Sequence, residues 1–188
     1  MRSLEPLNAG ALIWQLNDDW PVISWAAVDF EGHRKPLWHV ARQAFAPCLA
    51  IIAPGSSPLA QASTWPGALP RKDILELVLV NDSMVDWSGS WVIRRMGLDG
   101  TTSAQHVIHA AVAAGQTARF AIPDGLAGFD DPSKEILVAE TDHDFARVIF
   151  NPAEVMDQHL VAHPLKASVV DDGEQGLCAY RACRCLCA

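Results

Sequence analysis

Apolar and polar positions alternate in short runs through the middle of the chain, from about residue 46 to residue 150. Leu75, Leu77 and Leu79, for example, alternate with other side chains, as expected for a strand with one covered face. Turn-forming sequences such as Asp99-Gly100 separate the runs. The pattern predicts strands at 46–53, 74–81, 89–96, 104–110, 116–122, 136–140 and 146–150. Short strands at this spacing favour two packed antiparallel sheets, a β-sandwich.

The first 47 residues follow a different pattern. The apolar run 10–16 ends in the polar Asn17-Asp18-Asp19, which is typical of a buried strand that enters a loop. Apolar residues then recur at helical spacing over 36–45, with Pro36 at the first turn and Pro47 beyond the end. One strand followed by one helix is half of a parallel β/α repeat, so the strand's neighbours are expected to lie elsewhere.

Residues 151 onward look like a linker, and 165–170 resembles the first strand of a further module. After Leu177 the strand alternation gives way to a tail that contains Cys183, Cys185 and Cys187. We interpret this tail as the product of a frameshift or a truncated reading frame.

Composition narrows the classes of function. Half of the 188 residues are apolar and 19% are charged, so the chain can bury a core and is expected to be globular. The net charge of −8 would repel a phosphate backbone, which argues against nucleic-acid binding. No apolar stretch is long enough to span a membrane. The N-terminus lacks the apolar core of a signal peptide, but the compartment stays open for a chain that begins within a domain.

Other candidate chemistry is weak. His106 with His109, and His159 with His163, have spacings that a metal could use, but no third ligand lies nearby in the sequence. The tail cysteines lack the paired spacing of a zinc site. The sequence shows no glycine-rich phosphate loop and no Ser-His-Asp order. We therefore expect no metal and no cofactor.

A resemblance gives the N-terminal pattern a meaning. The run 10–18, Gly-Ala-Leu-Ile-Trp-Gln-Leu-Asn-Asp, followed by Trp20-Pro21 and Ser24-Trp25, resembles the signature of the eighth barrel strand in the β-mannosidases of glycoside hydrolase family 2. The similarity continues through Lys35-Pro36-Leu37 and Ala41-Arg42 to Phe45-Ala46-Pro47. It is dense over about the first fifty residues and extends to the fold over the next hundred.

The resemblance implies a mainly β fold, an immunoglobulin-like antiparallel β-sandwich preceded by the terminal β/α unit of a TIM barrel. The expected domains are a barrel remnant at 1–47, the sandwich at 48–152, and at 153–188 a linker, a partial next strand and the Cys-rich tail.

The resemblance also implies an activity. Retaining glycosidases use one carboxylic acid as acid/base and a second carboxylate as nucleophile, and in this family both glutamates lie on earlier barrel strands. No catalytic residue is therefore expected in this chain, and the chain alone is expected to be inactive. Its partners would be the rest of the barrel and, through the parent enzyme, a β-mannoside oligosaccharide or glycan. Uncovered barrel surface also predicts self-association.

Three residues are candidates for sugar contact. By its position, Trp14 matches the family's tryptophan that lines the mannose subsite, and an indole offers a flat apolar surface to a sugar ring. Asn17 and Asp18 could bond sugar hydroxyls or, in keeping with their residue type, hold the loop. Trp20, Trp25 and Trp38 are expected to pack the loop and the helix.

Two alternatives remain at this point. The chain could be a non-catalytic carbohydrate-binding or interaction sandwich that carries a barrel remnant. It could also belong to a related family 2 enzyme, of which an exo-β-glucosaminidase fits the Trp14–Asp18 motif best.

Overall fold

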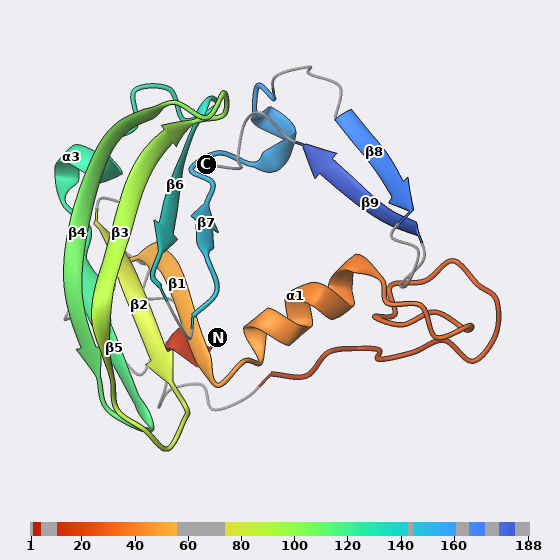
Figure 1. Ribbon diagram of the computed structural model, residues 1–188. Coiled ribbons are helices and arrows are strands. Elements are labelled where there is room, and N and C mark those ends of the chain that lie inside the picture. Colours follow the sequence, from red (N-terminus) through yellow and green to blue (C-terminus); the bar gives the residue numbers. More distant parts are fainter. Residues whose placement is uncertain are drawn as a thin grey trace.

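The structure is a computed structural model that describes residues 2–4, 11–55, 74–142, 145–160, 166–171 and 177–182. Most of the described chain forms antiparallel sheets (Figure 1). The strands of the main body are β1 (Cys48–Pro54), β2 (Leu75–Asn81), β3 (Trp87–Gly97), β4 (Thr102–Val112), β5 (Gln116–Ala121), β6 (Glu135–Glu140) and β7 (Val148–Phe150). Each lies within two residues of its expected ends.

The seven strands form two sheets. One sheet has the order β1-β2-β5 and the other the order β4-β3-β6-β7, and all pairs are antiparallel. The fourth strand therefore pairs with β3 rather than with β5, which leaves three strands in one sheet and four in the other. The arrangement confirms the predicted immunoglobulin-like sandwich.

The inward side chains of both sheets meet in one core. Leu77 and Leu79 come from the first sheet, and Trp91, Ile93 and Leu137 come from the second; each of these five is fully buried. Two further aromatic rings complete the centre of the core. Phe145 lies edge-on to Trp87 and to Trp91, with ring centroids 5.0 and 5.5 Å apart, a preferred aromatic geometry.

A buried amide closes one end of the sandwich. Asn81, the last residue of β2, is fully buried. Its amide nitrogen donates to the carbonyl oxygens of Val85, Val112 and Ala113 at 2.8, 3.2 and 3.3 Å. Its oxygen accepts from the backbone and the hydroxyl of Ser83 at 3.1 and 2.6 Å. One side chain thus joins the end of β2 to the following turn and to the end of β4.

The expected helix is present as α1 (Pro36–Ala44), but the expected strand over 10–16 is not formed: residues 11–16 are irregular. The cause is the lack of neighbours, because a parallel strand forms only between strands that satisfy its backbone groups. Among the described residues, the chain from 17 to 34 makes only isolated bridges, Asn17 with Val28 in parallel and Val28 with Arg34 in antiparallel orientation. The described residues therefore show the expected helix without the expected strand.

Helix α1 is joined to the sandwich by an arginine near the N-terminus. Arg2, in the short 3-10 helix η1 (Arg2–Leu4), donates to the carbonyl oxygens of Ala44 and Ala46, both at 2.7 Å. Arg2 also pairs with Asp82 at 2.5 Å, just after β2. Figure 1 shows α1 running from this junction to the segment 11–35, which lies farthest from the sandwich.

The C-terminal prediction needs a correction. The lone strand expected at 165–170 is instead one arm of a hairpin, β8 (Lys166–Asp171) paired with β9 (Leu177–Ala182). Strand pairing thus continues past Leu177, because the backbone of β9 finds a partner in β8. Residues 183–188, with Cys183, Cys185 and Cys187, lie outside the described part of the chain. The short elements α3 (Asp124–Ala127) and η2 (Val155–Asp157) complete the fold.

The Asn81 network predicts a stability effect. Asn81→Ala is expected to lower the free energy of unfolding by about 1–3 kcal/mol, because buried carbonyl groups lose their donor. The exposed-face control Gln105→Ala is expected to change it by less than about 0.5 kcal/mol. Urea denaturation followed by circular dichroism measures both. An unchanged unfolding midpoint in the Asn81 variant would contradict the proposed role of the amide.

Candidate functional site

The segment 11–35 carries all three candidate sugar-contact residues, and a few backbone bonds fold it back on itself. The amides of Ala27 and Val28 donate to the carbonyl oxygens of Gln15 and Leu16 at 3.2 and 2.9 Å, and the amide of Asp18 donates to Val28 at 3.1 Å. Farther along, the amide of Lys35 donates to Ala27 at 2.9 Å. These bonds bring residues 15–18 beside 26–28 and beside the start of α1.

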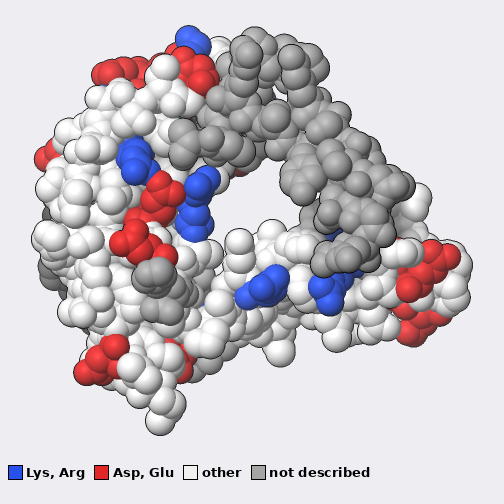
Figure 2. Space-filling view, viewed as in Figure 1, with Lys and Arg blue, Asp and Glu red and all other residues white. Residues whose placement is uncertain are grey.

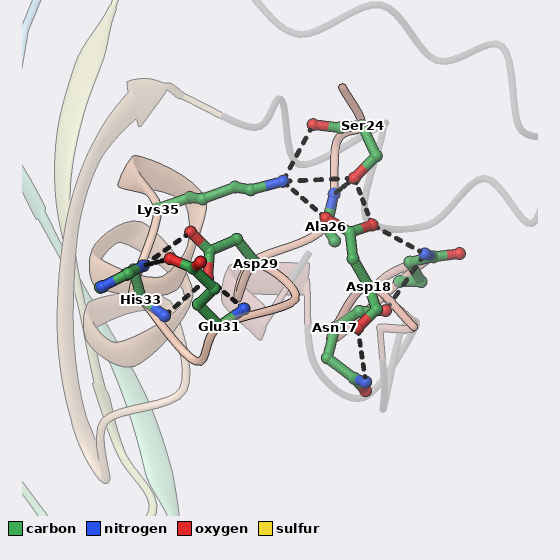
Figure 3. A network of polar contacts seen from close by, with 9 residues as sticks. Asn17, Asp18, Ser24, Ala26, Asp29, Glu31, His33 and Lys35 are labelled. Carbon is green, nitrogen blue, oxygen red and sulfur yellow. Dashed lines mark hydrogen bonds and ion pairs between the residues drawn. The ribbon is translucent and has the colours of Figure 1, made fainter. Parts of the chain in front are cut away.

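The carboxylate of Asp18 lies at the centre of this loop (Figure 3). Its side chain is only 2% exposed. One oxygen accepts from the Ser24 hydroxyl at 2.6 Å, and the other pairs with the Lys35 ammonium at 2.8 Å. The Ser24 oxygen also accepts from the Ala26 amide at 3.0 Å and from Lys35 at 3.2 Å. Asp18, Ser24 and Lys35 therefore pin three parts of the segment together.

The same contacts determine the charge state of Asp18. The Lys35 ammonium, and after it the Ser24 hydroxyl, lower the pKa of the Asp18 carboxyl below its ordinary value of 3.8. A carboxyl whose pKa is lowered by folding adds stability above its unfolded pKa and loses it as the pH falls through the lower folded value. The pin is therefore fully charged at neutral pH and opens only in acid, below pH 3.8.

A second carboxylate shapes the turn before α1. Asp29 accepts from the amides of Glu31 and His33 at 3.0 and 2.7 Å, and its other oxygen lies 3.0 Å from the His33 ring. Gly32 within this turn has a φ of 88°, a conformation that glycine adopts without strain. This is a local backbone role, typical of aspartate in turns.

Trp14 and Asn17 are accessible, unlike Asp18. The Trp14 side chain is 79% exposed, and the peptide bond between Trp14 and Gln15 is cis. Asn17 is also exposed, and its amide makes a long contact within the described part of the chain, 3.5 Å to the carbonyl oxygen of Asp18. Both side chains are thus free to meet a ligand, whereas the carboxylate of Asp18 is fully engaged within the protein.

The expectation that Trp20 and Trp25 pack the loop is wrong. Their residues are 63% and 71% exposed, and both line an open pocket of about 300 Å³ in the same segment. The sequence around them, with Pro21 and Ser24, did not indicate that the two tryptophans would be exposed. Apolar residues in a loop usually indicate packing, which is why packing was expected. Trp38 does pack, with the guanidinium of Arg34 4.2 Å from its ring centroid.

Within the described residues, the pair His106 and His109 does not form a metal site. His106 and His109 lie three residues apart on β4, so they point to opposite faces of the sheet. His109 instead lies 2.9 Å from the Ser90 hydroxyl. Over the described residues, no three His, Cys, Asp or Glu side chains come close enough to hold an ion, and His163 lies outside that part of the chain.

None of the helices in the described ranges has both the length and the apolar character to cross a bilayer.

Comparisons with known proteins point to one group of enzymes. No protein-family model matches the chain. The chain is 50% identical to β-mannosidase of Mus musculus over 42 residues, which are 22% of this chain and 5% of that protein. It is 31% identical to β-mannosidase B of Aspergillus niger over 90 residues, or 48% of this chain and 10% of that protein.

A solved structure extends the likeness to the fold. The β-D-mannosidase of Dictyoglomus thermophilum superimposes with a TM-score of 0.66 at 22% identity, over 89% of this chain and 18% of that enzyme. The chain thus corresponds to under a fifth of the solved enzyme, and its matches span a tenth or less of these two curated relatives. The resemblance to β-mannosidases expected from the Trp14–Asp18 motif is confirmed.

The pin around Asp18 predicts a local change in protection. Lys35→Met is expected to lower the hydrogen-exchange protection of the Ala27 and Val28 amides, because Asp18 loses its cation and the loop opens. The sandwich amides are expected to keep theirs. Lys134→Met is the matched control, since it breaks the more exposed pair with Asp131. Equal protection at Ala27 and Val28 in wild type and Lys35→Met would contradict the pin.

Proposed function

We propose that this chain is the C-terminal part of a retaining exo-β-mannosidase, an enzyme that hydrolyses terminal β-D-mannose residues. In this proposal residues 1–47 supply the last β/α repeat of the (β/α)8 barrel, 48–152 form an accessory scaffold, and 153–188 lead into a further module. The observation that carries the proposal is the 50% identity with a β-mannosidase over 42 residues, in a chain whose segment 11–35 exposes its apolar side chains.

The exposure of this segment supports the barrel part of the proposal. Leu12 and Ile23 are completely exposed, and Leu16 is 67% exposed. Helix α1 buries none of its residues; Val40 within it and Phe45 just beyond it are 61% and 52% exposed. A self-contained domain buries such surface, and contiguous exposed apolar residues usually mark an interface. The remaining barrel repeats would cover Leu12, Leu16 and helix α1, and would supply the missing neighbours of residues 11–16.

Within this proposal the three candidate residues have different roles. Trp14 offers its exposed indole as the platform for the mannose ring, since residues at the C-terminal end of a barrel strand face the active site. Asn17 is free to bond a sugar hydroxyl. Asp18 acts indirectly, because its ion pair with Lys35 at 2.8 Å holds the backbone that carries the other two.

The reaction itself needs two carboxylates about 5–5.5 Å apart on either side of the glycosidic bond. In the segment 11–35 the buried carboxylate, Asp18, is neutralised by Lys35, and Asp29 is committed to its turn. Neither is placed as a nucleophile or an acid. The catalytic pair would therefore come from the earlier barrel strands, and this chain alone would bind rather than cleave.

Trp14 provides the direct test of the function. In the complete gene product, Trp14→Ala is expected to lower kcat/KM for a p-nitrophenyl β-D-mannoside by roughly tenfold to a hundredfold, or about 1.4–2.8 kcal/mol of transition-state binding. Trp14→Phe should retain part of the activity, because a smaller flat ring remains. Trp38→Phe is the control, since Trp38 lies on α1 under Arg34 and is not one of the candidate sugar-contact residues. Absence of β-mannoside hydrolysis by the wild-type gene product would refute the proposed function.

The uncovered surface predicts the solution behaviour of the 188-residue chain. Sedimentation velocity is expected to show self-association that weakens in the double variant Leu12→Asp/Ile23→Asp, because the two most exposed apolar side chains become charged. The double variant Gln105→Asp/Thr102→Asp adds the same charge on β4 and should not weaken it. A wild-type chain that sediments as a clean monomer would contradict the prediction.

A further inference from the structure

The open pocket in segment 11–35 has a lining that suits a small polar ligand. Two indoles, two aliphatic side chains, two carboxylates, one amide and one hydroxyl surround it; they belong to Gln15, Asp18, Asp19, Trp20, Val22, Ile23, Ser24 and Trp25. Its volume of about 300 Å³ is at the lower end of the range for small-molecule sites, about 300–1,000 Å³. The pocket therefore has room for one compact ring rather than for a chain segment.

The two indoles are available for stacking. Trp20 and Trp25 keep 63% and 71% of their surface exposed, and neither has a ring partner among the described residues. An exposed indole combines a flat apolar face with an N–H donor. Two of them beside one pocket can stack on the C–H face of a sugar ring and donate to its hydroxyls.

The polar groups of the pocket select the charge of the ligand. Asp18 is saturated by Lys35 and Ser24, so Asp19 contributes the exposed carboxylate. The described lining contains no Lys, Arg or His. Figure 2 shows acidic side chains gathered at this end of the molecule, whereas the basic ones lie over α1 and the sandwich. An anionic sugar would be repelled here, and a neutral sugar would find a carboxylate acceptor for its hydroxyls.

The geometry points to a second sugar subsite, formed by Trp20, Trp25 and Asp19, that takes a neutral sugar next to the one on Trp14. This inference rests on the proposed function, since it assigns the neighbouring residue of a β-mannoside to the pocket beside the Trp14 platform. Gln15 connects the two, because it follows Trp14 in the chain and lines the pocket. The ligand class is then a neutral oligosaccharide of at least two sugars rather than a uronic-acid glycan.

The test is a titration of the 188-residue chain with β-1,4-mannobiose, followed by the indole N–H resonances of its tryptophans. The resonances of Trp20 and Trp25 are expected to shift, and Trp20→Ala or Trp25→Ala should each weaken binding by about tenfold or more, equivalent to about 1.4 kcal/mol. Trp20→Phe should restore part of it. Trp38→Phe is the matched control and should bind as wild type does.

The outcomes separate the subsite from the proposed function. Binding that is lost in Trp14→Ala but unchanged in Trp20→Ala and Trp25→Ala overturns the subsite and leaves the β-mannosidase proposal standing. Absence of any shift at Trp20 and Trp25 overturns it as well. Equal affinity for a disaccharide with a glucuronic acid residue overturns the preference for neutral sugars. Hydrolysis by the complete gene product tests the proposed function independently.

Discussion

Every backbone amide and carbonyl that leaves water needs a hydrogen-bond partner, and this constraint divides the chain into two parts. In the sandwich the strands find these partners in each other, so β1 to β7 close around one core. Segment 11–35 has no such neighbours and makes only isolated bridges. A few backbone bonds fold it back on itself, and the side chains of Asp18, Ser24 and Lys35 hold the folded parts together.

In segment 11–35 a buried ion pair stabilises the backbone, as strand pairing does in the sandwich. The Asp18 carboxylate is 2% exposed, and such burial is favourable only when the charge is paired and its remaining lone pairs are bonded. Lys35 and Ser24 satisfy both conditions. Because Lys35 directly precedes α1, the same contact sets where the helix begins relative to the loop. The candidate sugar-binding side chains are thus held by a polar pin at one end of a helix rather than by a packed core.

The regular part of the fold could be predicted from the sequence because its signals are local. Alternation and turn residues define β2 and β6, and the helical spacing with Pro36 defines α1; these elements lie within two residues of their expected bounds. The prediction of a strand at 10–16 was wrong, because a parallel strand forms only beside neighbouring strands. A local sequence pattern cannot indicate whether such neighbours are present. The hairpin of β8 and β9 was missed because Cys178 and Arg181 obscure the alternation of β9.

The site was predictable only in part, for a related reason. The motif singled out Trp14 and Asp18, yet one is exposed and the other is a buried pin. Trp20 and Trp25 read as packing residues, since apolar side chains are usually buried. Ala26 and Ala27, which are buried, form the interior of the loop instead. Residue type indicated which side chains are suited to sugar contact. The backbone hydrogen bonds of the loop determine which of these side chains are exposed.

The position of the loop relative to the sandwich depends on one further contact. Arg2 holds the last carbonyl of α1 at Ala44 and the carboxylate of Asp82 beyond β2, so the helix and the first sheet share one guanidinium. An arginine suits this junction, because its planar fork donates to several acceptors at once. Segment 11–35 extends beyond the other end of α1 (Figure 1). The scaffold can therefore orient this loop without touching it, through a helix fixed at one end by Arg2 and at the other by Lys35.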